Sequence, residues 1–400
     1  LQTEMRDRWG SARELREALI TLRQFLQRAQ PGQEPERVAR VVTPSHPSGT
    51  IPREAYRPPA ITGGEGDVLD IPALAPPIAW VFEAQGAIRS SPTVRDDLVY
   101  FGAHDAHLYA VALRDGQQQG TFAVTGNVCS DPLVTERSVL FGAEDGHMYA
   151  LNRSLTRKQW SYPIGKPIVA TPALCGDLVV IGANDGLVYA FPQTGGEPRW
   201  RFETWGPVRG TLAAFGEQII FGSQDQRIYA VDAEGRRLWH RTTRDKVEAL
   251  PVARRGVVYI GGMDQHLYAL DQEHGTLLWK RRLEGCILTA AAARDGRIYA
   301  GSADGRITCL DARTGETKWR YNVRSQITSD LVLREQRLYF GCADGGMYCL
   351  DAHRQEVCWR HQAGGAIVTR PALVNGLVII GSVDHRVYAL HDTSAAAQDA

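Results

Sequence analysis

Short apolar segments separated by Gly, Asp or Asn recur along most of the chain, and one copy shows the pattern clearly. Residues 168–174 alternate loosely between apolar and polar positions, and residues 178–182 form a continuous apolar run. Residues 187–191 are again apolar, whereas residues 199–202 alternate polar and aromatic side chains. Asn184-Asp185-Gly186 favours a hairpin between the two apolar runs, because Asp and Gly accept the positive φ angles of tight turns. The pattern predicts four short antiparallel strands.

The same pattern recurs eight times, and the string Gly-x-x-Asp marks each copy. Successive marker Asp residues are 40 residues apart, with one interval of 39. They are Asp105, Asp145, Asp185, Asp225, Asp264, Asp304, Asp344 and Asp384. Ile or Val stands 17 residues before every marker Asp, Tyr stands four residues after seven of them, and Trp stands 25 residues before seven. Four strands per copy predict an all-β fold, an eight-bladed β-propeller of four-stranded blades, which we number 1 to 8.

The phase of the repeat also predicts how the ring closes. The copy marked by Asp384 is followed by no Trp, whereas Trp80 precedes the first copy without strands of its own. We therefore expect residues 78–83 to supply the outer strand of blade 8, which removes the free sheet edges of an open ring. In blade 1 Gly120 occupies the Trp position, and Phe122, on the same strand face, is expected to substitute for the missing Trp.

Further residues recur around the marker Asp. The clearest copy reads Asp304-Gly305, Leu310-Asp311, Thr314-Gly315-Glu316 and Trp319. This string resembles the PQQ-like propeller repeat, whereas the Trp-Asp dipeptide of WD repeats is absent from the copies. The resemblance covers residues 77–394, the expected propeller domain. In that family the outer-strand Trp docks against the neighbouring blade, and the resemblance implies the same here.

The resemblance brings two known classes of protein with it. Dehydrogenases that use pyrroloquinoline quinone and calcium are longer, with insertions and an adjacent Cys-Cys pair, and this sequence has neither insertions nor such a pair. We therefore expect no catalytic residue, no metal and no pyrroloquinoline quinone, and keep the dehydrogenase as one alternative. The outer-membrane assembly lipoprotein, an envelope scaffold with eight such blades, is another alternative. It needs a lipobox Cys, which the first residues lack.

The chain outside the propeller has a different pattern. Residues 1–30 are expected to contain a helix, because Leu recurs at helical spacing and Ser11 with Glu14 forms a capping box. Residues 31–76 are rich in Pro and Gly and predict a linker. Residues 395–400 are expected to form a tail.

Residues 7–15 (Asp-Arg-Trp-Gly-Ser-Ala-Arg-Glu-Leu) resemble the last turn and final helix of a bacterial Ser/Thr protein kinase domain. In that family an Arg before this helix pairs with a Glu beside the activation segment, and the matching residue is Arg8. The Gly-rich loop, His-Arg-Asp and Asp-Phe-Gly strings of a kinase core do not occur in the sequence. We therefore expect this chain to have no kinase activity of its own.

Composition narrows the classes of partner. Lys plus Arg and Asp plus Glu are 45 each, so no net charge favours a nucleic acid or an acidic membrane surface. No apolar stretch of about 18 residues predicts a membrane span. Seven cysteines, an odd number without paired C-x-x-C strings, indicate reduced thiols in the cytoplasm rather than disulfides or a zinc site.

Candidate binding residues are those at which one copy departs from the others. Charged residues 16 or 14 positions before the marker Asp are expected to line the central channel and to hold a small polar ligand, or else to pair with one another. These channel candidates are Arg89, Asp131, Arg209, Glu248, Asp330 and Arg370. Basic residues two positions after the marker Asp are expected to project from one rim and bind an acidic or phosphorylated partner, or else to be merely solvated. These rim candidates are His107, His147, Arg227, His266, Arg306 and Arg386.

The marker Asp residues themselves are interpreted as turn caps rather than as a carboxylate site. The sequence therefore predicts a cytoplasmic, non-catalytic propeller that binds a small polar ligand or a protein as a sensor or scaffold. The first hypothesis is the C-terminal regulatory region of a bacterial Ser/Thr kinase, with a kinase domain in cis. A stand-alone interaction propeller is the alternative within the same class.

Overall fold

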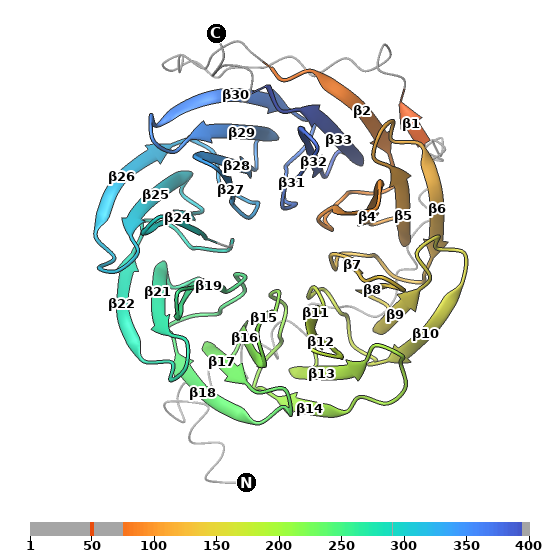
Figure 1. The fold of residues 1–400 in the computed structure, drawn as a ribbon, viewed down its shortest axis with the longest axis horizontal. Coiled ribbons are helices and arrows are strands. Elements are labelled where there is room, and N and C mark those ends of the chain that lie inside the picture. The colour runs from red at the N-terminus through yellow and green to blue at the C-terminus, as the bar shows by residue number, and fades with distance from the viewer. Residues whose placement is uncertain (1–48, 52–74, 290, 394–400) are drawn as a thin grey trace, which may run out of the picture. The chain divides into compact units, whose positions relative to one another are not determined.

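The computed structural model describes residues 49–51, 75–289 and 291–393, and these form eight antiparallel sheets arranged around a ring (Figure 1). Blades 1 to 7 each consist of four consecutive strands, from the innermost to the outermost. The eight-bladed, all-β fold predicted from the repeat is thereby confirmed. Within the described residues no helix is long and apolar enough to cross a membrane.

The strands have the following bounds. Blades 1 and 2 contain β3 (Thr93–Arg95), β4 (Leu98–Gly102), β5 (His107–Ala112), β6 (Gln118–Ala123), β7 (Leu133–Val134), β8 (Val139–Gly142), β9 (His147–Leu151) and β10 (Lys158–Pro163). Blades 3 and 4 contain β11 (Ala173–Cys175), β12 (Leu178–Gly182), β13 (Leu187–Pro192), β14 (Trp200–Glu203), β15 (Ala213–Phe215), β16 (Gln218–Ser223), β17 (Arg227–Val231) and β18 (Arg237–Thr242). Blades 5 and 6 contain β19 (Val252–Arg254), β20 (Val257–Gly261), β21 (His266–Asp271), β22 (Leu277–Arg282), β23 (Ala292–Arg294), β24 (Arg297–Gly301), β25 (Arg306–Asp311) and β26 (Thr317–Asn322). Blade 7 contains β27 (Val332–Arg334), β28 (Arg337–Gly341), β29 (Gly346–Asp351) and β30 (Glu356–Gln362), and blade 8 contains β31 (Ala372–Val374), β32 (Leu377–Gly381), β33 (Arg386–His391), β2 (Ile78–Glu83) and β1 (Gly49–Ile51).

The second and third strands of a blade are buried, and the outer strand is half-exposed. All five residues of β12 are buried, whereas β14 alternates between half-buried and exposed side chains. The apolar clusters lie between adjacent blades, so that both faces of the middle strands are covered. The innermost strand is shorter than predicted, because β11 begins only at Ala173. The residues before it bond to the previous blade, where the N–H of Ile168 donates to the carbonyl oxygen of Ala143 at 3.1 Å.

The Gly of the marker string and the Ile or Val of the next copy form one repeated contact between blades. A Cβ atom at Gly182 would lie 2.4 Å from Cγ1 of Val208, well inside van der Waals contact, so only Gly admits the Val side chain. The N–H of Val208 donates to the carbonyl oxygen of Ala183 at 3.1 Å. The contact also joins blade 8 to blade 1, where a Cβ atom at Gly381 would lie 2.4 Å from Cγ2 of Ile88. We call this the glycine contact.

The marker Asp accepts hydrogen bonds from its own turn, from the third strand of its blade and from a loop of the previous blade. The Oδ1 atom of Asp145 accepts the N–H of His147 at 3.0 Å, and its Oδ2 atom accepts the hydroxyl of Tyr149 at 2.8 Å. The same Oδ2 atom accepts the N–H of Thr125, in the loop that leaves the previous blade, at 3.2 Å. The predicted turn-cap role is therefore extended to the third strand and to the neighbouring loop.

The outer-strand Trp docks on the next blade, as the resemblance implies. The Nε1 atom of Trp200 donates to the carbonyl oxygen of Ala233 at 2.7 Å. Its ring lies against Gly235, which has a φ of +79°, and a Cβ atom there would approach the ring to 2.6 Å. Gly at this turn therefore supplies both the left-handed backbone and the room for the indole ring.

Blade 1 lacks the Trp, and the next blade compensates for it. A Cβ atom at Gly120 would lie 2.5 Å from a carbonyl oxygen of blade 2. Where other blades have the turn Gly, blade 2 has Leu155, which is 2% exposed, has a φ of +57° and joins the apolar cluster at this junction. Phe122 occupies the position that Phe82 and Phe202 hold in blades that also have a Trp. Phe122 also packs against this cluster, with its ring centroid 6.4 Å from that of Tyr149 in blade 2, so Phe122 and Leu155 cover the junction together.

The ring closes through strands from both ends of the described chain, as predicted. β2 pairs antiparallel with β33, and the register runs from Ile78 opposite Leu390 to Glu83 opposite Arg386. β1 then pairs with β2, with Gly49 opposite Glu83, so blade 8 has five strands. β1 lies within residues 31–76, which were expected to form a linker. The predicted helix within residues 1–30 and the tail at residues 395–400 lie outside the described residues.

The glycine contact makes a stability prediction. Gly182→Ala is expected to lower the free energy of unfolding by about 1 to 3 kcal/mol, because the new methyl group overlaps Val208. Val208→Ala in the same chain removes the overlapping Cγ1 atom, so the double variant should lose less than the sum of the two single losses. Denaturant unfolding of the four proteins measures this coupling. Strict additivity would show that the two residues do not oppose each other.

Ring closure makes a second prediction. A variant lacking residues 1–85 loses β2 and leaves β33 with an unpaired edge, so limited proteolysis should degrade the propeller faster and the protein should aggregate. A variant lacking residues 1–74 keeps β2 and serves as the control. Equal protease resistance of the two variants would contradict the role of β2 in closing the ring.

Candidate functional site

The six channel candidates lie in the segments that enter the innermost strands, next to the centre of the ring (Figure 1). Arg89, Arg209 and Arg370 are exposed, and Asp131, Glu248 and Asp330 are half-buried. They come from blades 1, 2, 4, 5, 7 and 8, so the fold distributes them around the ring instead of gathering them at one point.

Some of these segments are joined to one another by hydrogen bonds. The N–H of Arg370 in blade 8 donates to Oγ of Ser91 in blade 1 at 3.0 Å, and the N–H of Ser91 donates to Oδ1 of Asp131 in blade 2 at 2.5 Å. The N–H of Asp131 donates to Oγ1 of Thr171 in blade 3 at 3.3 Å. Four blades are thereby linked in series. The carboxylate of Asp131 is therefore a structural acceptor as well as a binding candidate.

Burial raises the pKa of Asp131 to about 6, although the Ser91 N–H acts against this rise; the charge of Asp330 raises the pKa further. Glu248 is also engaged, because Nε2 of Gln224 donates to its Oε1 atom at 2.5 Å. The exposed guanidinium groups of Arg89, Arg209 and Arg370 are thus the channel candidates with most of their surface open to a ligand.

A cluster that the sequence analysis missed lies beside Arg89. Sγ of Cys129 is 3.1 Å from Nε2 of His104 and 3.6 Å from Oε1 of Glu144, and Nδ2 of Asn127 donates to Oε2 of Glu144 at 2.8 Å. Burial and the Glu144 charge raise the pKa of the Cys129 thiol to about 12, and burial with the Arg89 charge lowers the pKa of His104. A protonated thiol beside a neutral imidazole is not an activated nucleophile.

A sequence signal for this cluster exists. The residue immediately before the marker Asp is polar in blades 1 to 4 and apolar in blades 5 to 8, and His104 and Glu144 stand at that position. It meets the residue 16 positions before the next marker Asp, as His104 meets Cys129 and Gln224 meets Glu248. Reading the two positions as a pair across the blade junction would have identified both contacts.

The rim candidates all begin third strands, and each contacts its own blade or an adjoining loop. Nδ1 of His107, His147 and His266 lies 2.8, 3.3 and 2.8 Å from the carbonyl oxygen of the marker Asp two residues earlier. Arg386 pairs with Glu83 at 3.3 Å, and Arg306 pairs with Asp304 at 2.9 Å and with Glu284. These contacts hold the six side chains near separate blades and do not bring them together in one site.

Arg227 is the rim candidate with an aromatic partner. Its guanidinium carbon lies 4.2 Å from the ring centroid of Trp205, which is 79% exposed. The N–H of Trp205 donates to Oδ2 of Asp225 at 3.0 Å, and the hydroxyl of Thr204 lies 2.7 Å from the carbonyl oxygens of Gly186 and Gly206. The loop that carries Trp205 is therefore held firmly. Trp205 is not among the rim candidates predicted from the sequence. The other seven copies have no Trp at the equivalent position.

The cofactor of the dehydrogenase alternative can be tested against these residues. The acidic channel candidates Asp131 and Glu248 are hydrogen-bonded to Ser91 and Gln224. Within the described ranges, no three His, Cys, Asp or Glu side chains are grouped so that they could hold a metal ion. Among the described residues, these two carboxylates and their partners therefore do not form a calcium-binding set.

The raised pKa of Asp131 makes a prediction about pH. The folded protein binds this proton more tightly than the unfolded chain, so the stabilisation that it provides is present at pH 4 and is lost as pH rises through about 6. Asp131→Asn removes that dependence. The stability of wild type relative to Asp131→Asn should therefore fall between pH 4 and pH 7, by at most about 3 kcal/mol. Urea unfolding of both proteins across this range measures it, and a constant difference would contradict the raised pKa.

Comparison with known proteins places the fold in a family. The family model described as outer membrane protein assembly factor BamB matches residues 80–201, 157–255, 224–336 and 304–398. Among solved structures, BamB from Moraxella catarrhalis is 18% identical, with a TM-score of 0.69, 78% of this chain covered and 98% of that one. A computationally designed protein is 20% identical, with a TM-score of 0.69 and coverage of 77% and 97%. A europium-containing methanol dehydrogenase is 14% identical, with a TM-score of 0.66 and coverage of 76% and 85%.

No curated protein sequence matches this chain significantly. At identities of 20% and below, the similar structures show the fold alone, and a scaffold and a dehydrogenase share it. The family matches are more informative, because together they span residues 80–398 and include all eight blades. The PQQ-like repeat inferred from the sequence is confirmed, and the chain belongs to the family of the outer membrane protein assembly factor BamB.

Proposed function

We propose that this propeller is a non-catalytic scaffold that binds a partner protein on the face carrying the turns between second and third strands. The observation that carries the proposal is Trp205, an exposed aromatic side chain stacked beneath Arg227 on a hydrogen-bonded loop. Trp and Arg are the residues most enriched among the energetic hot spots of protein interfaces. A side chain held in place before binding also loses little conformational entropy on association.

Charge around Trp205 suggests the chemistry of the partner. Arg209 follows it by four residues and is exposed, and Arg227 lies over the indole ring. An aromatic side chain under a guanidinium group, with a further exposed Arg in the same segment, suits a surface with a carboxylate or phosphate beside an apolar residue. This arrangement supports the predicted binding of an acidic or phosphorylated partner, but at one part of the rim rather than around all of it.

Two cellular settings are proposed for this surface. The first candidate is a cytoplasmic regulatory region linked in cis to a bacterial Ser/Thr kinase domain, and it rests on residues 7–15 and on the cysteine content of the sequence. The second candidate is a scaffold for outer membrane protein assembly, and the family match favours it. Both candidates use a propeller as a binding surface, and the identity of the captured partner separates them.

A photo-crosslinking amino acid at Glu203, an exposed position two residues before Trp205, tests the surface in cells. We expect a discrete adduct with one partner protein, which weakens about tenfold or more when Trp205→Ala is added, because hot-spot truncations cost about 2 kcal/mol or more. Leu278→Ala is the matched control, because Leu278 is also a large exposed apolar residue (51%) but lies on the outer strand β22. Mass spectrometry of the adduct identifies the partner.

Two results would contradict the proposal. The first is an adduct that survives Trp205→Ala but is lost with Leu278→Ala, which would place the interface on the outer strands. The second is a saturable rise of the melting temperature with pyrroloquinoline quinone and calcium, which would favour the dehydrogenase alternative.

A further inference from the structure

Blade 7 carries two cysteines in its outer hairpin, one on β29 and one on β30. Cys349 stands five residues after the marker Asp, where six blades have Ala and blade 6 has Cys309. Cys358 immediately precedes the outer-strand Trp, where the other blades have Gln, Arg, Leu, Lys or Ala. Blade 7 is therefore the blade in which both positions are Cys, and a single turn separates them.

The pairing of the two strands places these cysteines next to each other. Cys349 lies opposite Trp359, and Leu350 lies opposite Val357, so Cys358 is the extra residue of a β-bulge that faces Cys349. Opposed residues of antiparallel strands have Cα atoms about 4.5 to 5.5 Å apart, and a disulfide needs a separation of about 4.4 to 6.8 Å. The backbone at this bulge is therefore compatible with a bridge.

The two thiols also contact each other in the interior. Cys349 is buried in the apolar cluster between blades 7 and 8, and half-buried Cys358 packs against the same cluster; neither is in a disulfide. Hydrogen bonding between the thiols lowers the pKa of Cys358 and raises the pKa of Cys349, and the Arg337 charge lowers the pKa of Cys358 further. The arrangement pairs a half-exposed thiolate with a buried thiol.

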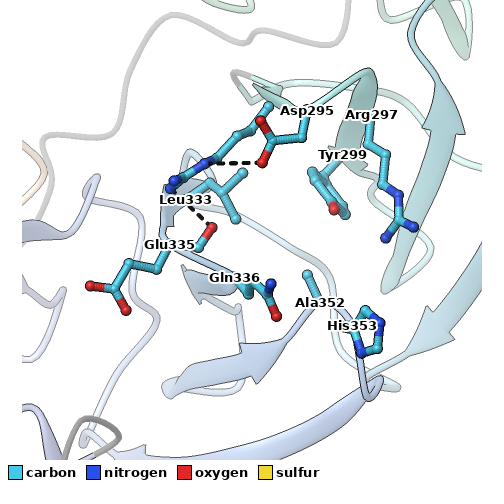
Figure 2. A pocket seen from close by; sticks show the side chains of 9 residues that line it. Asp295, Arg297, Tyr299, Leu333, Glu335, Gln336, Ala352 and His353 are labelled. Atoms are coloured by element: carbon cyan, nitrogen blue, oxygen red, sulfur yellow. Dashed lines mark hydrogen bonds and ion pairs between the residues drawn. The ribbon is translucent and has the colours of Figure 1, made fainter.

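The turn between the two cysteines is the exposed end of the hairpin. Residues 353–356 are exposed, and Ala352 and His353 border an open groove of about 220 Å³ between blades 6 and 7 (Figure 2). Gln355 has a φ of +60° where five blades have Gly, which adopts this conformation more readily. A bridge between the cysteines would close this segment at its base.

The bulge also positions the Trp that docks on blade 8. Trp359 directly follows Cys358 and is buried, and its Nε1 atom donates to Oδ1 of Asp392 at 3.2 Å. The hydroxyl of Tyr339 donates to the other carboxylate oxygen of Asp392 at 2.6 Å. A bridge at Cys358 would therefore fix the segment that joins blade 7 to the closing blade.

We propose that Cys349 and Cys358 form a reversible disulfide by exchange with a small disulfide such as oxidised glutathione, and that this bridge stabilises the hairpin. The more accessible Cys358 thiolate attacks one sulfur of the small disulfide, whose S–S bond breaks and releases one glutathione thiolate. The Cys349 thiol then loses its proton and attacks Sγ of Cys358, which forms the protein disulfide and releases the second glutathione. Two protein thiols are oxidised, and one glutathione disulfide is reduced to two thiols.

Redox titration of the full chain tests the proposal. The protein is equilibrated at rising ratios of oxidised to reduced glutathione, quenched with acid and digested with trypsin, which cleaves after Arg354 between the two cysteines. We expect mass spectrometry to detect one pair of peptides linked through Cys349 and Cys358, which increases to saturation and disappears on reduction. The oxidised protein should also melt a few degrees higher than the reduced protein, because the bridge restricts the unfolded chain.

The repeat itself supplies conservative variants, because blade 8 has Ala at both positions. Cys349→Ala removes the second thiol and should accumulate a mixed disulfide between Cys358 and glutathione, whereas Cys358→Ala should form neither product. Both variants should lose the dependence of the melting temperature on oxidation. Cys342→Ala is the matched control, because Cys342 is a buried thiol in the same tryptic peptide as Cys349, and it should keep the bridge.

The proposal is overturned if no linked peptide forms when oxidised glutathione is in large excess, or if Cys358 links to a cysteine other than Cys349. It is equally overturned if the Cys349→Ala variant takes up glutathione at another cysteine and not at Cys358. An oxidised protein that melts no higher than the reduced one would contradict the stabilising role of the bridge.

Discussion

Each blade meets the next where a branched side chain lies directly on a glycine of the second strand. With any other residue at Gly182 or Gly381, the segment entering the next blade would have to move outward to relieve the overlap. The close approach lets that segment bond to the previous blade, as the N–H of Val208 does to Ala183. It also brings the blades near enough to bury both faces of their middle strands. The position of the channel candidates follows from the same contact, because each stands one or three residues after the branched residue.

Most of the fold could be predicted because its contacts recur. Residues equivalent to Gly182 and Asp145 recur in all eight copies with the same structural role, so their spacing in the sequence predicts that role. The closing strand was predictable for the same reason, since Trp80 has a place in the repeat but no blade of its own. Leu155 was not predictable, because it compensates for a Trp that is missing from the previous blade. Taken by itself, Leu is unfavourable at a turn position with positive φ. β1 was not predictable either, because a three-residue strand paired through its backbone has no side-chain pattern.

The candidate site was less predictable than the fold. Departures from the repeat selected Arg227, which lies against Trp205, and also Asp131 and Glu248, whose carboxylates hold neighbouring segments together. What decides the role of an unusual residue is the residue it meets across the junction, and that partner is some 25 to 40 positions away in the sequence. Trp205 carries two signals of its own, because no other copy has Trp at its position and its side chain is exposed.

The pairing of β2 with β33 joins the first and last strands of the ring, and it imposes an order on synthesis and folding. β2 leaves the ribosome before every strand of blades 1 to 7, yet its partner β33 is made last. Blades 1 to 7 can assemble from neighbouring segments during this interval, while the edge of β2 that pairs with β33 stays unpaired. Joining such distant segments carries the largest loop-closure entropy in the molecule, so it is the natural final step of folding. In the finished protein, release of β2 opens the ring at blade 8 while the strand pairing within blades 1 to 7 stays intact.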